Sequence, residues 1–178
     1  MRKLKNEELK RLTPEQYRAS AKKPVTIILD NVRSLNNIGS VFRTADGFRI
    51  DKVILCGIST TPPHRDIHKT ALGAEASVKW DYYSETIDAV RTLREEGHII
   101  ISVEQVDSSI RLDEFVPGTN KPLALVFGHE VKGVQQEVVN ESDYCIEIPQ
   151  YGTKHSLNIS VSVGIVLWEI GQKLKLYP

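Results

Sequence analysis

The sequence predicts an α/β fold in which helices flank a mainly parallel β-sheet. Runs of β-branched and apolar residues alternate along the chain with amphipathic segments of helical period, the pattern of strands joined by helices. The 178 residues suit one ordinary domain, and 40% hydrophobic against 26% charged residues exclude a disordered or fibrous chain. No internal repeat or linker interrupts it. We therefore expect one domain over residues 24–178, preceded by a helical arm over residues 1–23.

Five apolar runs predict the strands, at residues 25–29, 52–56, 98–103, 123–127 and 144–148. Residues 38–45 and 84–96 have helical period, and each places its apolar side chains on one face. The expected inward-facing residues are Ile38, Val41, Phe42, Ala45, Ile87, Val90 and Leu93. Residues 57–72, which include two consecutive prolines, predict a long loop.

The segment 156–174 carries the signatures of both a strand and a helix. Its first half alternates apolar and polar residues, as a strand does, but about 19 residues with no breaker except Gly164 are too many for a typical strand. Ser156, Ser160 and Gly164 recur at a spacing of four, which would let a helix approach another backbone closely. We expect a helix. Its apolar residues Ile165, Leu167, Trp168 and Ile170 exceed what one sheet-facing side requires, which predicts that a second copy covers part of it.

Charge is distributed unevenly between the arm and the domain. Lys+Arg and Asp+Glu both total 23, so the formal net charge is zero and a globally basic nucleic-acid binder is excluded. Residues 1–23 nevertheless carry eight basic and three acidic side chains, which leaves +5 on the arm and −5 on the rest. Thr13, Pro14 and Gln16 form a capping box that starts a helix there. The arm either contacts a polyanion or is a solubilising helix.

Cysteine usage and the apolar pattern indicate a cytoplasmic protein. Cys56 and Cys145 each lie in or beside an apolar run, so we expect both to be buried and reduced. The first eight residues contain no apolar segment typical of a signal peptide. No apolar run approaches the 18 residues that a membrane span requires.

Several familiar chemical motifs are absent or incomplete. Gly128 and Gly133 have the spacing of a phosphate loop, but Val134 and Gln135 stand where Lys and Ser or Thr are required. No dinucleotide fingerprint occurs. His64 and His68 could share a helical face but lack a third ligand nearby, so we expect no metal site. Ser156 lacks the context of a hydrolytic nucleophile.

Three polar clusters next to apolar segments remain as candidate chemistry. In the first, Asn37 could cap the helix that carries Arg43, and Arg43 in its apolar setting is either a structural ion pair or an anchor for phosphate. In the second, Glu130 follows the turn at Gly128 after a buried strand. In the third, Ser156 opens an apolar helix, and Asn158 lies within that helix, where its amide must find partners if it is buried. Together they predict a polar pocket at one edge of the sheet.

At these clusters the sequence resembles the SpoU (TrmH) family of RNA ribose 2′-O-methyltransferases, within the SPOUT superfamily. Three family motifs are matched in order, and the resemblance covers roughly residues 24–172. The first, N-x-G-x-x-x-R-x-A, falls on Asn37, Gly39, Arg43 and Ala45. The second, F-G-x-E followed by Gly, falls on Phe127, Gly128, Glu130 and Gly133. The third, I-P-x-x-G-x-x-x-S-L-N-x-S-V, falls on Ile148, Pro149, Gly152, Ser156, Leu157, Asn158, Ser160 and Val161. His129 stands where the family commonly has Asn.

The resemblance implies a deep C-terminal trefoil knot, an exception to the rule that chains avoid knots. Residues 128–158 would be threaded and would hold S-adenosylmethionine through Gly128, Ile148, Pro149 and Leu157, with no metal. It implies a homodimer with the active site at the interface. It also implies methyl transfer to a ribose 2′-hydroxyl of tRNA or rRNA by catalytic residues Asn37, Arg43, Glu130, Ser156 and Asn158.

For this reaction an enzyme must orient a weak hydroxyl nucleophile and help to remove its proton. Arginine keeps its proton at neutral pH, so Arg43 is interpreted as a clamp for phosphate, with Glu130, Ser156 and Asn158 orienting the site. Two other classes stay open on the sequence. One is a catalytically silent RNA-binding dimer of the same fold, and the other is a small-molecule α/β enzyme that does not bind S-adenosylmethionine.

Overall fold

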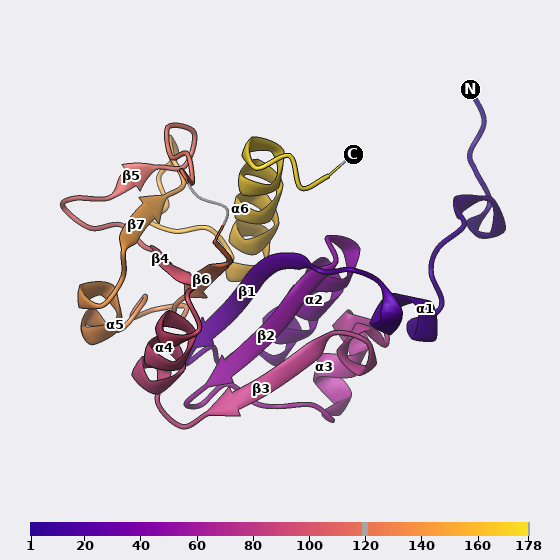
Figure 1. Cartoon of the computed structure of the whole chain (residues 1–178), viewed down its shortest axis with the longest axis horizontal. Helices are drawn as coiled ribbons and strands as arrows, with labels where there is room; N and C mark the ends of the chain where they lie inside the picture. The colour runs from indigo at the N-terminus through magenta and orange to yellow at the C-terminus, as the bar shows by residue number, and fades with distance from the viewer. Residues whose placement is uncertain (119–120, 178) are drawn as a thin grey trace.

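The computed structural model describes residues 1–118 and 121–177, and it confirms the predicted parallel α/β architecture (Figure 1). Seven strands form one sheet in the order β3-β2-β1-β6-β4-β7-β5, and every neighbouring pair is parallel. The strands are β1 Lys23–Asp30, β2 Ile50–Cys56, β3 Lys79–Tyr83, β4 Ile99–Val103, β5 Ile110–Arg111, β6 Leu123–Phe127 and β7 Tyr144–Glu147. The helices are α1 Pro14–Ala19, α2 Leu35–Gly47, α3 Arg65–Ala71, α4 Thr86–Glu95, α5 Gln136–Asn140 and α6 Ile159–Lys173, with single 3₁₀ turns at Asn6–Leu9 and Ala74–Ala76.

The sheet buries both of its faces. Successive side chains of β1 point to opposite faces, so Ile27 and Leu29 belong to one apolar cluster and Ile28 belongs to the other. The first cluster includes the inner sides of α2, α3 and α6, and the second those of α4 and α5. All five residues of the central strand β6 are buried, as expected for a parallel strand covered on both faces.

The inner faces of α2 and α4 confirm the predicted pattern, but the start of α2 differs. All seven residues expected to face inward are buried. Asn37 does not cap α2; the cap is Ser34, whose hydroxyl accepts a hydrogen bond from the Asn37 backbone N–H. The helix therefore begins one turn earlier than the apolar pattern indicates, and the Asn37 side chain is free for other contacts.

The predicted loop 57–72 is wrong in its second half, which forms α3. His64 caps this short helix by accepting a hydrogen bond from the Asp66 backbone N–H, and the buried residues Ile67 and Ala71 face the core. A Cβ on Gly39 would lie 2.1 Å from the Thr70 hydroxyl and 2.3 Å from the Ile67 carbonyl oxygen. Gly39 is therefore required for the close packing of α2 on α3.

The helix predicted over 156–174 is confirmed as α6, although it begins at Ile159. Asn158 is its cap, with its Oδ1 accepting from the Ser160 backbone N–H at 2.9 Å. The four apolar residues expected to exceed the needs of one sheet-facing side lie on two different sides of α6. Leu167 and Ile170 are buried, whereas Ile165 and Trp168 are exposed.

The arm contains the predicted helix α1, with both hydrogen bonds of the Thr13–Gln16 capping box in place. Tyr17 fixes α1 to the domain, because its side chain is only 4% exposed and belongs to the main core. The chain before α1 extends outward from the domain (Figure 1). Cys56 is buried and Cys145 half-buried, and both are free thiols. In the part of the chain described, none of the helices has the length and apolar composition of a membrane span.

Candidate functional site

A cavity of about 500 Å³ lies where β4, β6 and β7 end, at the carboxyl edge of the sheet. This is the edge at which open α/β sheets bind ligands. Its walls come from three segments at the ends of these strands, residues 103–105, 127–133 and 146–148 with Gln150, together with residues 155–159 and Ser162. The predicted polar pocket is therefore present, and two of the three polar clusters line it directly.

Glu130 organises one wall of the cavity. Its carboxylate accepts hydrogen bonds from the Ser34 backbone N–H at 2.9 Å, the Arg33 backbone N–H at 3.1 Å and the Asn37 amide at 3.2 Å. Partial burial opposes ionisation, but these hydrogen bonds, with one from its own backbone, outweigh it and lower the pKa of Glu130. Glu130 is thus a charged anchor for the start of α2.

Asn37 and Asn158 continue this network to the last helix. The Asn158 amide donates to the Asn37 Oδ1 at 3.1 Å, and the Asn158 Oδ1 accepts from the backbone and hydroxyl of Ser160. Glu130, Asn37 and Asn158 therefore link the starts of α2 and α6 to the turn after β6. Asn158 is exposed, so burial does not impose these hydrogen bonds; their effect is to cap α6 and to join it to α2.

The turn after β6 is built by backbone contacts that only glycine permits at position 128. Residues 129 and 133 exchange two backbone hydrogen bonds, and a Cβ on Gly128 would lie 2.1 Å from the Gly133 carbonyl carbon and from the Val134 nitrogen. The His129 Nδ1 accepts from the Val131 and Lys132 backbone N–H groups at 3.0 and 3.3 Å. The ring thus supplies a side-chain acceptor to the turn, as an Asn would.

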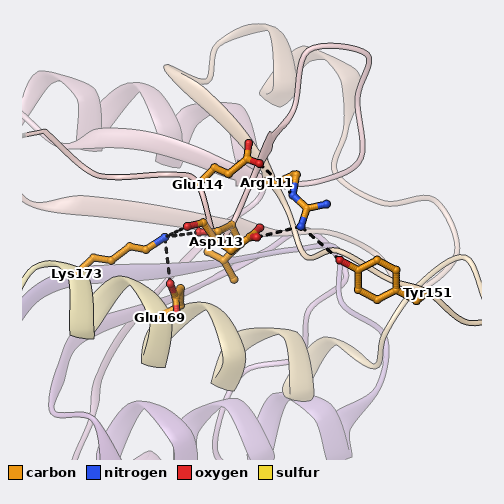
Figure 2. A network of polar contacts seen from close by, with 7 residues as sticks. Arg111, Asp113, Glu114, Tyr151, Glu169 and Lys173 are labelled. Atoms are coloured by element: carbon orange, nitrogen blue, oxygen red, sulfur yellow. Dashed lines mark hydrogen bonds and ion pairs between the residues drawn. The ribbon is translucent and has the colours of Figure 1, made fainter.

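The loop after β7 is fixed from outside by a polar network (Figure 2). Arg111 donates to Asp113 at 2.9 Å and to the hydroxyl of Tyr151 at 3.3 Å. Lys173 on α6 donates to the carbonyls of Leu112, Asp113 and Phe115, and pairs with Glu169 at 3.0 Å. The hydrogen bonds to Asp113 and Tyr151 raise the pKa of Arg111. The bond to Tyr151 joins the loop after β7 to strand β5.

The structure brings together most of the predicted site residues. Glu130, Ser156 and Asn158 line the cavity, as do Gly128, Ile148 and Leu157, and Asn37 contacts it through Glu130 and Asn158. Pro149 lies outside it, in an apolar groove with Ile165 and Trp168.

Arg43 is the exception among the proposed catalytic residues. Its side chain is exposed, with no ion pair or hydrogen bond to any residue in 1–118 or 121–177, so the expected apolar setting and the structural ion pair are both wrong. The neighbouring apolar residues face inward, and helical geometry turns Arg43 outward. It lines a different groove, between α2 and the arm.

Sequence reasoning missed Glu104 as a wall of the cavity. Its two carboxylate oxygens accept from the Val134 backbone N–H at 2.8 Å and the Gln105 backbone N–H at 2.9 Å. The sequence contained a signal for Glu104, because this residue directly follows a predicted strand, as the Gly128–Glu130 turn does.

Over the described ranges, no three His, Cys, Asp or Glu side chains gather as metal ligands.

Comparison with known proteins shows which family this chain resembles in sequence and structure. The model of the SpoU rRNA Methylase family matches residues 24–168. A Bacillus subtilis protein named as a TrmH family tRNA/rRNA methyltransferase, YacO, is 34% identical over 165 residues, covering 88% of this chain and 63% of the relative. The 23S rRNA (guanosine-2′-O-)-methyltransferase RlmB of Nitrosomonas europaea is 32% identical over 148 residues, covering 80% and 54%.

Among solved structures, an AdoMet-bound rRNA methyltransferase from Sinorhizobium meliloti superposes with a TM-score of 0.79 at 27% identity, covering 92% of this chain and 62% of that one. The chain spans less than two thirds of the length of these relatives. The match to the family model nevertheless extends over most of the chain and includes all three polar clusters, and on that ground the chain belongs to the SpoU rRNA methylase family.

Proposed function

We propose that this chain transfers a methyl group from S-adenosylmethionine to a ribose 2′-hydroxyl of tRNA or rRNA. The observation that carries the proposal is the hydrogen-bonded chain Glu130–Asn37–Asn158, which unites the three family motifs beside one cavity. Relatives named as 2′-O-methyltransferases support the reaction type. The intact network gives no support to the catalytically silent alternative.

The residues around the cavity fit S-adenosylmethionine. A volume of about 500 Å³ lies in the range of small-molecule sites. Ile148 and Leu157 provide apolar walls, the Gly128 turn provides backbone groups, and the carboxylate of Glu104 suits a ligand that carries positive charge. Bound there, the cofactor would supply a methyl group already activated by its sulfonium. A relative of this fold is crystallised with AdoMet.

The protein's own contribution is to orient the ribose and manage its proton. Glu130 is held ionised by backbone donors, so we assign it to positioning Asn37 and the start of α2. Asn158 fixes the start of α6, and the exposed hydroxyl of Ser156 at the cavity is available to the ribose. Arg43, a permanent cation, would hold an RNA phosphate, and that phosphate can relay the proton of the 2′-hydroxyl.

We propose a homodimer, because Arg43 lines a groove other than the cavity within one chain. A second copy can bring its Arg43 to the cavity if the two chains associate through α6. Val161, Ile165 and Trp168 are 50%, 38% and 55% exposed there and form one apolar stripe. Such a stripe suits a protein interface.

We also propose that residues 128–158 form the trefoil knot. Residues 128–133 and residues 148, 150 and 155–158 line the cavity from different parts of the chain, and α6, which follows them, packs against α2. Since both cysteines are free thiols, we expect the reaction to take place in the reducing cytoplasm.

Calorimetry with S-adenosylmethionine and methyl transfer to separate pools of bulk tRNA and bulk rRNA test the proposal. We expect cofactor binding and label recovered as 2′-O-methylnucleosides from one of the two pools after nuclease digestion. Label on a base would contradict ribose methylation. Absence of cofactor binding would contradict the proposal as a whole and favour a small-molecule enzyme of another kind.

A further inference from the structure

A second cavity of about 840 Å³ separates the arm from the body of the domain. One wall is formed by residues 9–12, Pro14 and Tyr17 of the arm. The other is formed by Arg43, Asp46 and Gly47 of α2, by Arg49 just after this helix, and by residues 71–74 and Ser77. We call this cavity the arm groove. None of the residues of the ligand cavity at the strand ends belongs to it.

Positive charge dominates the arm groove. Lys10, Arg11, Arg43 and Arg49 line it against a single carboxylate, Asp46. All four cations are exposed, and within residues 1–118 and 121–177 their side chains make neither hydrogen bonds nor ion pairs. Other cations of the arm are engaged, since Arg2 pairs with Glu8 at 2.6 Å and Arg18 with Glu15 at 3.3 Å. The chain as a whole is neutral, so this excess is local.

The arm side of the groove is anchored to the domain at α1. Tyr17 is buried in the main core, the Lys22 ammonium lies 4.3 Å from the centre of its ring, and the capping box fixes the start of α1. Residues 9–12 of the groove are therefore tethered directly next to an anchored helix. Cations close to an anchored element lose less conformational freedom when they bind than cations on a long free tail.

Helix α2 carries one residue of the ligand-cavity network and one residue of the arm groove. Asn37, in its first turn, contacts Glu130 and Asn158 at the ligand cavity, and Arg43 lines the groove six residues later, about 9 Å along the axis. An RNA strand lying in the groove would therefore already touch Arg43, the residue assigned to the reacting phosphate at the ligand cavity of the second copy.

We propose that the arm groove binds the phosphate backbone of the RNA substrate, with Lys10, Arg11 and Arg49 holding phosphates that flank the one held by Arg43. The inference rests on the proposed function and extends it to three cations outside the family motifs. Unpaired cations around a groove suit a polyanion. The apolar stripe on α6 is the surface that suits a second copy instead.

Lys10→Gln/Arg11→Gln tests the groove, with Lys3→Gln/Lys5→Gln as the matched control. The control removes the same charge from the same arm outside the groove. Arg49→Asn is a second groove variant, because Asn tolerates the left-handed backbone of Arg49 at φ 53°. Binding of a fluorescein-labelled 20-nucleotide oligouridylate is measured by anisotropy across a salt series, with thermal unfolding and sedimentation on each variant.

We expect the double groove variant to lose about tenfold or more in RNA affinity at 0.1 M salt. Its log–log salt slope should flatten by about 1.4, at roughly 0.7 per single-strand phosphate contact. Arg49→Asn should flatten the slope by about half as much. The control should keep the wild-type slope, and all variants should keep wild-type affinity for S-adenosylmethionine.

Equal RNA affinity in the groove and control variants, with methyl transfer by the wild type intact, would overturn the groove and leave the proposed function standing. A change in sedimentation or unfolding temperature without a change in salt slope would also overturn it, and would make the groove a contact with a second copy or a structural feature. A wild-type chain that neither binds oligouridylate nor methylates RNA would overturn both proposals.

Discussion

At the scale of single residues, the negative charge of Glu130 holds the start of α2 and Asn37 in position beside the cavity. One carboxylate satisfies two backbone N–H groups near the start of α2 and orients Asn37. A carboxylate can accept all of these hydrogen bonds because it presents two oxygens and no donor. The residue therefore acts on the site through α2, and its ionised form is the one that the fold requires.

Glu130→Gln should destabilise the protein by about 1–3 kcal/mol, because its NH₂ group would face a backbone N–H donor. The ordinary pKa of 4.5 is lowered in the fold, so the contribution of the carboxylate is complete above that pH and disappears as pH falls through the lower, folded-state pKa. Denaturant unfolding of both proteins should show their difference shrinking below about pH 4.5. A difference that stays constant to pH 3 would contradict this, and exposed Glu95→Gln is the control.

Arg43 should matter for the reaction and not for the fold. Its side chain is exposed and without partners among the described residues, so Arg43→Ala should change unfolding free energy by less than about 0.5 kcal/mol. Methyl transfer should fall by orders of magnitude while cofactor affinity is retained. Arg43→Lys should also be poor, because the planar bidentate fork is lost. Wild-type turnover by Arg43→Ala would refute the role assigned to this arginine.

At the scale of elements, amphipathic period predicts helices well and their ends poorly. The inner face of α2 follows from four apolar positions, but its start depends on Ser34, which carries no apolar signal. The short helix α3 has only two buried residues in seven, and it depends on the closeness to α2 that Gly39 permits. Strand β5, two residues long, and the exposed edge strand β3 offer too short or too weak a pattern to be recognised.

Helix α6 illustrates a pattern whose two sides serve different purposes. Leu167 and Ile170 complete the core, while Ile165 and Trp168 remain on the surface beside Pro149. Apolar composition alone does not tell these pairs apart, because all four residues favour burial. Only the packing in the structure shows that Leu167 and Ile170 are buried. The exposed pair, Ile165 and Trp168, is the surface for the proposed dimer.

Ile165→Glu/Trp168→Glu should convert the proposed dimer into a folded monomer of 20.0 kDa, because the charges would oppose burial of the stripe. Sedimentation equilibrium at micromolar concentration measures the mass. Exposed Ile58 lies far from α6 in the sequence, and Ile58→Glu is the control that should remain dimeric. A wild-type chain that sediments as a monomer would contradict the interface.

At the scale of the whole molecule, topology decides what the sequence pattern cannot. Local patterns identify the central strands but not their order, and the order places the ends of β4, β6 and β7 around one cavity. Asn37 bonds to residues 93 and 121 positions away, distances over which periodicity carries no information. The three family motifs predicted that most of these site residues would lie around one cavity. They did not predict that Arg43 would face another groove.

Because the cavity walls come from distant parts of the chain, S-adenosylmethionine should stabilise the whole domain. Binding to the native state alone adds about 2.7 kcal/mol at a concentration 100-fold above Kd. For a chain of this size that corresponds to an increase in Tm of roughly 5–11 °C. Hydrogen exchange should show added protection at residues 128–133 and 148–158 and none at residues 1–12, which lie outside the cavity.

Adenosine alone should give a smaller increase in Tm, because it lacks the cationic sulfonium and ammonium groups that Glu104 would attract. Protection confined to the arm, or no change in Tm at saturation, would place the cofactor elsewhere or exclude it.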